Sequence, residues 1–536
     1  MRTHLMLIAL LLSHFIAPAQ SITKYDLNPG SASSVPANFL VAGNKMFFTT
    51  LNYDTTVLWV TDGSANGMRK IKQTKLRQYS YAFDNLVALN GKVFFLATDT
   101  SSSVFNQLWV SDGTDTGTYM IKEITNNSRT TGIVSTMTAY KGRLIFPATD
   151  NSGPALWSSD GTEAGTGIIY TNPGSNWFPG SDFCFFQGKE YFIVQDQFDK
   201  GSLWYTDGTK AGTQTLNIPS LGKYIPANGS MIATRDKIFF PMSDSLHGNE
   251  LWVSDGTVSG THLVKDIAPG IADSKPLLQP SPLSNKVFFT ASNKPNYINA
   301  FCTDGTDTGT HLFWHDLIYN PRSWNAVFKG HYYFNSTYLD SLLVTDGTQP
   351  GTEPLKDNDG NYVPQGVVAP YNNALYIIQN SAPGISGRVY KTDGTQEGTY
   401  LIKQGTPGSY LLTWKHASIE FNGSLWISAT LDSDGQELWR ITDTTTIILQ
   451  PIQPFAIYPN PNHGSFTIST ADSNFIGRIH ICDVAGREVY YNNHVSGATI
   501  HVTIPGAAAG VYFLTMQDIS DPKTSRTISS YKIVVW

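Results

Sequence analysis

The stretch Gln107-Leu-Trp-Val-Ser-Asp112-Gly-Thr-Asp-Thr-Gly117-Thr118 returns, with small changes, eight times along the chain. Its constant part is Asp-Gly-(Thr/Ser)-x-x-Gly, and successive copies begin 42 to 50 residues apart, as from 304 to 346 and from 62 to 112. Self-similarity at a period of about 48 residues predicts a solenoid, a propeller or another repeat array. The eight aspartates are Asp62, Asp112, Asp160, Asp207, Asp255, Asp304, Asp346 and Asp393.

Each period contains four short apolar runs. Around the quoted stretch they are 85–89, 92–97, 107–111 and 118–122. Such runs are too short for helices and are bounded by Gly, Asn and Asp, which indicates strands. Asn90-Gly91 joins the first two runs and is a strong hairpin signal, because both residues of that turn need positive φ. Four strands joined by hairpins in one period predict one blade of a β-propeller.

The repeated turn has a structural interpretation. An Asp side chain accepts hydrogen bonds from the backbone two residues on, and Gly supplies angles that a side chain forbids. We therefore predict that the turn holds backbone geometry, and that identical turns on separate blades lie too far apart to share a metal ion. Its first glycines are Gly63, Gly113, Gly161, Gly208, Gly256, Gly305, Gly347 and Gly394, and its second are Gly67, Gly117, Gly165, Gly212, Gly260, Gly309, Gly351 and Gly398.

A large apolar residue stands three positions before each of these aspartates. At that fixed strand position it is expected to pack between neighbouring blades, and a Trp there buries about 150–250 Å². A row of aromatic rings that binds carbohydrate is the alternative interpretation. The residues are Trp59, Trp109, Trp157, Trp204, Trp252, Phe301, Leu343 and Tyr390.

The two ends of the repeat region are irregular. A ninth unit, 418–449, keeps the strand pattern but lacks the Asp-Gly turn. At the other end, residues 22–30 resemble the last strand of a full unit, 263–270. A lone last strand before the first full unit suggests that the chain ends meet to close a ring. We predict one closed propeller of eight or nine blades, with two smaller propellers or an open arc as alternatives.

Composition and the N-terminus indicate export. The charged fraction is only 15% and the net charge −6, which argues against a nucleic-acid partner because such proteins carry a basic stripe. Residues 1–19 have the pattern of a secretory signal, with Arg2 before the apolar run 5–12 and small residues before Gln20. No other segment approaches the length of a membrane span. The three cysteines, Cys184, Cys302 and Cys482, are expected to be buried free thiols.

The period stops at a Pro-bearing connector, 450–456, and short alternating strands follow it. We therefore divide the chain into a signal peptide (1–19), a propeller (20–449), a linker (450–456) and a small C-terminal β-sandwich (457–536). The last part resembles the type A C-terminal sorting domain of the type IX secretion system. That resemblance implies the secretion machinery as partner, and a product that is secreted or attached to the outer-membrane surface. The matching residues are Tyr458, Pro459, Asn460, Pro461, Gly464, Gly486, Gly510, Tyr512 and Lys532.

The repeat itself resembles the ELWxxDGT family, which 250–257 matches nearly letter for letter. That family is defined by sequence and implies no activity. We found no motif of a metalloprotease, serine hydrolase or phosphate-binding loop. No catalytic residue, metal site or cofactor is therefore predicted.

Weaker patterns keep other possibilities open. His311 and His315, together with Asp316, could bind a metal ion if the segment were helical, because positions i and i+4 share a face, but they follow an Asp-Gly turn where a strand is expected. Segments 357–361 and 432–437 resemble the start of calcium loops without the full spacing, and ordinary polar turns are the favoured interpretation.

The sequence leaves two classes of function. The favoured hypothesis is a non-catalytic propeller that binds or adheres to extracellular glycan or protein through variable loops such as 101–106, 293–299 and 381–387. The alternative is a secreted polysaccharide hydrolase or lyase with carboxylates at the mouth of the channel. Asp196, Asp199 and Asp244 are the acids considered for that role.

Overall fold

The molecule is known from a computed structural model, and its described residues form strands and turns. The chain divides into two compact units, Gln20–Asp443 and the C-terminal Thr444–Trp536, the second grouped with Met1–Ala19. The described residues are 19–29, 33–52, 55–75, 86–97, 107–124, 132–133, 137–150, 152–171, 178–179, 183–196, 200–218, 221–222, 231–279, 285–294, 297–315, 325–336, 339–381, 384–407, 418–444, 456–458, 464–469, 476–483, 487–497, 499–518 and 526–535.

The first unit consists of antiparallel sheets that follow one another along the chain. Eight successive sheets are β2 (Ala37–Ala42) to β5 (Arg69–Lys75) with β3 (Lys45–Asn52) and β4 (Thr55–Thr61); β6 (Val87–Leu89), β7 (Lys92–Ala97), β8 (Gln107–Ser111) and β9 (Tyr119–Lys122); β10 (Gly132–Ile133), β11 (Thr138–Tyr140), β12 (Arg143–Asp150), β13 (Gly153–Ser159) and β14 (Gly167–Thr171); β15 (Phe178–Pro179), β16 (Cys184–Phe186), β17 (Lys189–Gln195), β18 (Gly201–Thr206) and β19 (Gln214–Leu216); β20 (Ile232–Ala233), β21 (Ile238–Met242), β22 (Glu250–Ser254) and β23 (His262–Lys265); β24 (Leu277–Leu278), β25 (Val287–Lys294), β26 (Tyr297–Thr303) and β27 (His311–Trp314); β28 (Ala326–Phe328), β29 (His331–Ser336), β30 (Ser341–Thr345) and β31 (Thr352–Pro354); and β32 (Val367–Tyr371), β33 (Ala374–Gln379), β34 (Ser386–Thr392) and β35 (Tyr400–Pro407).

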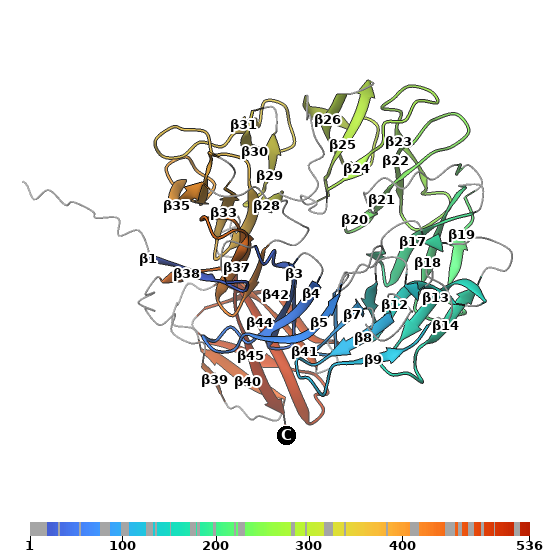
Figure 1. The fold of residues 1–536 in the computed structure, drawn as a ribbon. Helices are drawn as coiled ribbons and strands as arrows, with labels where there is room; N and C mark the ends of the chain where they lie inside the picture. The colour runs from blue at the N-terminus through green and yellow to red at the C-terminus, as the bar shows by residue number, and fades with distance from the viewer. Residues whose placement is uncertain are drawn as a thin grey trace, which may run out of the picture. The chain divides into compact units, whose positions relative to one another are not determined.

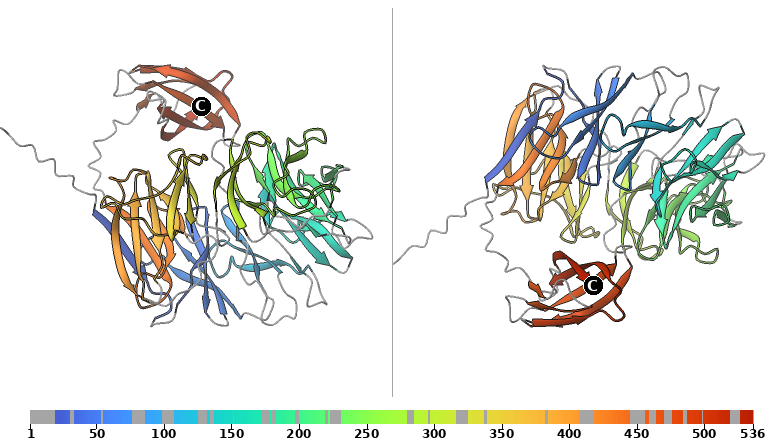
Figure 2. Two further views of the ribbon diagram at one scale, coloured as in Figure 1. Left: turned by 90° about the horizontal axis from the view of Figure 1, so that it is seen from above. Right: turned by 90° about the horizontal axis from the view of Figure 1, so that it is seen from below.

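A ninth sheet in the described residues joins the two ends of this unit. It consists of β36 (Ser418–Phe421), β37 (Ser424–Ala429) and β38 (Glu437–Thr444), and its outer strand is β1 (Ala19–Tyr25) from the N-terminus. The sheets are arranged around a common centre (Figure 1), and Figure 2 shows them from two further sides. First strands of adjacent sheets contact each other, including β2 with β6, β32 with β36, and β36 with β2. This arrangement is a β-propeller.

Apolar clusters fill the spaces between adjacent sheets. Phe47 and Phe95, from the first two sheets, belong to one cluster, and corresponding clusters lie between the following pairs. A further cluster joins the last sheet to the first through Trp426, Phe48 and Trp59. The core of the propeller is therefore made of the contacts between sheets, since each sheet alone buries too little apolar surface.

The hairpins between first and second strands have the predicted geometry. Asn90 and Gly91 have φ of 51° and 74°. Lys141 and Gly142 have φ of 46° and 76° at the equivalent place in the third sheet. Two successive positive φ angles are what a two-residue hairpin needs to match the twist of its strands, so the hairpin prediction is confirmed.

The C-terminal unit has two antiparallel sheets. Side chains from both form one apolar core that includes Phe466, Ile481, Val502 and Leu514. The three-stranded sheet is β39 (Ala456–Tyr458), β40 (Ser465–Ser469) and β43 (Thr499–Thr503); the four-stranded sheet is β42 (Glu488–Ser496), β41 (Ile476–Asp483), β44 (Gly510–Asp518) and β45 (Arg526–Val535).

The prediction of an all-β chain with a propeller is confirmed for the described part. No stretch of the described residues forms a helix long and apolar enough to cross a membrane. The predicted signal peptide, residues 1–19, lies outside the described residues apart from Ala19.

Candidate functional site

The Asp-Gly turns connect the third and fourth strands of eight sheets, and their polar groups bond within the turn. In one example, Asp255 Oδ1 accepts hydrogen bonds from the backbone N of Thr257 (2.9 Å) and its Oγ1 (2.7 Å). Thr257 Oγ1 in turn accepts from the N of Gly260 (3.0 Å). Hydrogen bonds from Thr257 lower the pKa of Asp255, because they favour its charged form.

The two glycines of the turn serve different purposes. Gly256 has a φ of +89°, which side-chain-bearing residues rarely adopt. Gly260 has no such φ, but a Cβ there would overlap the Asp255 carboxylate. The geometry of this turn thus depends on both glycines and on hydrogen bonds within the turn.

Each turn also touches the preceding sheet. Lys45 donates to the carbonyl of Asp112 (2.7 Å), and Lys237 donates to the carbonyl of Asp304 (2.7 Å). At the closure of the ring, Asn422 of the last sheet donates to the carbonyl of Asp62 in the first (3.2 Å). These contacts place the first hairpin of one sheet and the Asp-Gly turn of the next on one face, which we call the turn face.

The large residue before each turn is buried between sheets, as predicted. Trp252 is 3% exposed and packs with the preceding sheet, and Trp109 and Tyr390 lie in equivalent clusters. In six sheets the pairing of the third and fourth strands shifts beside this residue. Because the rings are buried, they do not form an exposed carbohydrate platform.

Replacement of Trp59 by Ala is expected to lower the free energy of unfolding by about 3–5 kcal/mol. The ring is 8% exposed, stacks on Phe48 and donates through Nε1 to Thr50 (2.9 Å). Denaturant titration of both proteins measures the change. Tyr119, 47% exposed on an outer strand, supplies the control Tyr119→Ala, which is expected to change stability by well under 1 kcal/mol. Equal losses in the two variants would contradict the packing role of Trp59.

The segments that resemble calcium loops are held by protein groups. Asp357 Oδ1 accepts from the backbone N of Asn361 (2.8 Å), as in an ordinary polar turn. Lys24 of β1 forms ion pairs with Asp432 (3.1 Å) and Asp434. Its ammonium thus lies where a bound cation would have to lie. In the part of the chain that the structure describes, no group of three or more His, Cys, Asp or Glu residues could hold a metal ion.

The other candidate residues are separated. His311 lies in strand β27, as the repeat pattern predicts, with Nε2 2.8 Å from the carbonyl of Gly347. His315 is exposed, and Asp316 is outside the described residues. Cys184 and Cys302 are buried free thiols, but Cys482 is only partly buried because it lies on an outer sheet face. The expectation of burial was therefore wrong for Cys482.

The acids considered for catalysis lie in loops between second and third strands. Asp196 Oδ1 accepts from the backbone N of Lys200 (2.9 Å), and Asp244 Oδ2 lies 2.9 Å from Nδ1 of His247. Although partial burial opposes it, the hydrogen bonds from His247 hold the pKa of Asp244 below its usual range. Asp199 is outside the described residues. Asp196 and Asp244 thus each form hydrogen bonds within their own loop.

Sequence reasoning missed two buried glutamates. Glu250 accepts from the backbone N of Ile267 (3.2 Å) and Ala268 (3.0 Å) and from Ser274 Oγ (2.6 Å). Glu437 likewise accepts hydrogen bonds from Leu27 and Ser34. It therefore holds the N-terminal segment in the way that Glu250 holds the connection from one sheet to the next. The letter Glu before Leu-Trp in both units was the available signal. These glutamates therefore fix connections between sheets.

A third buried glutamate, Glu190, predicts a pH dependence. Burial raises its pKa to about 7, although Thr138 Oγ1 donates to it (3.3 Å). Because the folded protein binds this proton more tightly than the unfolded chain, the protonated form of Glu190 favours folding. This contribution is fully present below about pH 4.5 and is lost as the pH rises through about 7. Glu190→Gln keeps an acceptor for Thr138 and removes the titration. From pH 5 to pH 8 the variant should therefore gain about 2–3 kcal/mol relative to the wild type.

Denaturant unfolding of both proteins at pH 5 and pH 8 measures this difference. Glu250→Gln is the contrasting variant, because its amide NH₂ would face a backbone N–H and one donor would lose its acceptor. Burial raises the pKa of Glu250 to about 7 as well, so the contrast is expected at pH 5, where Glu250→Gln should be less stable than the wild type. Parallel pH profiles for the wild type and Glu190→Gln would contradict the assignment.

Among the sorting-signal residues, Tyr512 belongs to the apolar core of the C-terminal unit. Tyr512 is 7% exposed, and its hydroxyl donates to the carbonyl of Ala508 (2.8 Å). Gly464 has a φ of +88° before β40, and Gly510 begins β44. Tyr458 and Lys532 lie in β39 and β45. The remaining four, Pro459, Asn460, Pro461 and Gly486, are outside the described residues.

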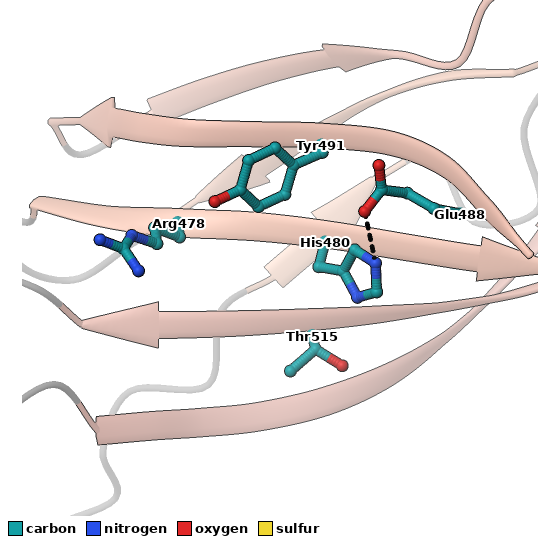
Figure 3. A pocket seen from close by; sticks show the side chains of 5 residues that line it. All are labelled: Arg478, His480, Glu488, Tyr491 and Thr515. Atoms are coloured by element: carbon teal, nitrogen blue, oxygen red, sulfur yellow. Dashed lines mark ion pairs between the residues drawn. The ribbon is translucent and has the colours of Figure 1, made fainter. Parts of the chain in front are cut away.

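A shallow cavity of about 290 Å³ lies on the four-stranded sheet of this unit (Figure 3). It is lined by Arg478, His480, Glu488, Tyr491 and Thr515. His480 Nε2 forms an ion pair with Glu488 Oε2 at 2.9 Å, drawn as the dashed line. No sequence motif pointed to this site, because its residues come from three strands that only the fold brings side by side.

Solved structures with some likeness to the chain share little sequence with it. A prolyl endopeptidase has 9% identity and a TM-score of 0.35, over 92% of this chain and 55% of that one. The β-propeller domain of the Trilobed protease from Pyrococcus furiosus has 12% identity and a TM-score of 0.33, over 69% and 98%. Apo AztD from Citrobacter koseri has 10% identity and a TM-score of 0.32, over 59% and 84%. The chain thus spans about half of the endopeptidase, and we draw no functional conclusion from these likenesses.

No curated protein matches the chain. Residues 456–530 match the family model of the secretion system C-terminal sorting domain, which confirms the resemblance noted in that part of the sequence. The C-terminal unit is therefore a sorting domain that addresses the protein to its secretion machinery, and the protein is exported and either secreted or attached to the cell surface.

Proposed function

We propose that this protein is an exported, non-catalytic propeller that binds extracellular glycan or protein. In this proposal the nine described sheets are the blades of one closed ring of ELWxxDGT-type repeats, and the Asp-Gly turns are its scaffold. The C-terminal unit is a β-sandwich that begins near residue 457. Ring closure is supported by the outer position of β1 in the last sheet and by the cluster that joins the last sheet to the first.

One observation carries the binding function: six exposed apolar side chains lie in or beside the loops of the face opposite the turns. In an antiparallel sheet of four strands, the loop between the second and third strands lies at the same end as the connection to the next sheet. We call the face formed by these segments the loop face. Six exposed side chains lie there on four consecutive sheets: Leu246, Ile271, Tyr297, Leu339, Tyr362 and Ile385.

These side chains are largely exposed to solvent and do not belong to the apolar core. Ile271 is 86% exposed, Leu246 68% and Tyr362 61%. The loops that carry Leu246 and Ile271 are joined by a hydrogen bond from the N of Gly248 to the carbonyl of Gly270 (3.0 Å). Clustered exposed apolar residues mark interaction sites, whereas single ones need no explanation.

Binding and turnover assays on the purified full-length protein test the proposal. The probes are an array of extracellular polysaccharides and a panel of extracellular matrix proteins. We expect binding without bond cleavage, weakened at least about tenfold by Ile271→Ser with Tyr362→Ser, because exposed anchors dominate such interfaces. Val258→Ser, on a turn of the opposite face and 47% exposed, is the matched control. Cleavage of a bound glycan, or equal loss in the control, overturns the proposal.

A further inference from the structure

The two outer faces of the sorting domain differ in chemistry. The outer face of the three-stranded sheet carries small polar side chains that bond to each other across strands. Ser465 bonds to Thr503 (3.0 Å), and Thr467 to His501 (3.0 Å). The alternate residues of these strands, such as Phe466, are buried in the core. These four side chains of β40 and β43 thus bond to one another across the strands.

The outer face of the four-stranded sheet has a different character. His480 is the cross-strand neighbour of Tyr491 on one side and of Thr515 on the other. In the next row, Cys482 lies between Glu488 and Phe513. Cross-strand neighbours point to the same side of a sheet, so these side chains form one surface. We call it the Tyr491 face, made of Arg478, His480, Glu488, Tyr491, Phe513 and Thr515.

Two aromatic side chains are exposed on this face and do not belong to the apolar core. Tyr491 is 53% exposed and Phe513 is 47% exposed. The exposed side chain of Arg478 lies at the edge of the 290 Å³ cavity, beside the pair His480–Glu488 (Figure 3). Tyr and Arg are the side chains most enriched among the residues that dominate protein–protein binding. The Tyr491 face therefore has the composition of a protein interface.

The family match implies one partner for this domain, the secretion machinery. The domain has two outer sheet faces to which that partner can bind. We propose that the Tyr491 face is the surface on which a protein of the secretion machinery docks. An apolar side chain of that protein covers the rings of Tyr491 and Phe513, and a carboxylate pairs with the Arg478 guanidinium, which suits its planar fork. The buried motif residue Tyr512 acts differently, by holding the strand that presents Phe513.

Export of point variants of the full-length chain, in cells that carry the secretion machinery, tests this assignment. The test variant combines Arg478→Glu with Tyr491→Ala, and a second combines Tyr491→Ala with Phe513→Ala. The control combines Thr467→Ala with His501→Ala on the opposite face. Thermal unfolding of each purified protein checks that the domain stays folded, since all these positions are at least partly exposed.

We expect the exported fraction to fall at least about tenfold for both test variants, as for the loss of a dominant interface residue, and to remain at the wild-type level for the control. Normal export of the test variants overturns the proposal. Equal loss in the control does so too, because the faces would then be equivalent. Export at the wild-type level followed by loss from the cell surface also overturns it, since the face would then serve attachment and not docking.

Discussion

Deletion of residues 456–536 is expected to abolish export and to leave the propeller inside the cell envelope. The sorting domain has its own apolar core, which contains side chains from the C-terminal unit alone. The clusters between the propeller sheets likewise contain side chains from 20–443 alone. Removing the domain therefore takes away the export address without removing any described part of the propeller core.

Immunoblots of medium, cell surface and periplasm, with the intact chain as control, measure this effect. The truncated protein should be absent outside the cell and should resist protease in the periplasmic fraction as a folded propeller does. Appearance of the truncated chain in the medium would show that export does not depend on this domain. Degradation in the periplasm would show instead that the propeller needs the domain for stability.

Removal of residues 20–25, the part of β1 that follows the predicted signal peptide, is expected to unfold or open the ring. β1 is the outer strand of the last sheet, and its Tyr25 ring lies 5.3 Å from that of Trp426. Trp426 is completely buried, and Lys24 is clamped by Asp432 and Asp434. Without β1 the sheet loses its edge strand, an exposed edge invites aggregation, and the cluster that joins the last sheet to the first is opened.

Glu437→Ala is the point variant that tests the same closure. Its carboxylate accepts from the backbone N of Leu27 (3.1 Å) and of Ser34 (3.0 Å) and from Ser34 Oγ. Because each orphaned buried donor costs about 1–3 kcal/mol, we expect a loss of at least about 3 kcal/mol. Denaturant titration measures it, with Glu420→Ala, an exposed acid of the same sheet, as control. A loss under 1 kcal/mol would mean that the N-terminal segment does not close the ring.

The repeat could be read from the sequence because it rests on local chemistry. The Asp255 turn needs glycine at 256 for its φ and at 260 for room beside the carboxylate, and both requirements leave fixed letters in the chain. The same holds for Asn90-Gly91. The sorting domain was recognisable for a related reason, since Gly464 has a positive φ and Tyr512 packs in the core of its own domain.

Other features left no local trace. Glu190 looks like an ordinary strand residue, and only the neighbouring sheet decides that it is buried. Segment 432–437 resembles the start of a calcium loop. The positive charge that pairs with its aspartates is the ammonium group of Lys24, about four hundred residues away in the chain. Such contacts depend on the ring bringing the two ends of the chain together.

The sequence by itself determined the all-β class, the repeated turn and the export address, because each follows from backbone angles or periodicity within a few tens of residues. Only the tertiary structure decided which strand completes the last sheet, which apolar side chains remain exposed on the loop face, and that Arg478, Tyr491 and Phe513 share one surface. Those outcomes depend on pairing between strands far apart in sequence, where register and burial are set by the partner strand and not by the residue itself.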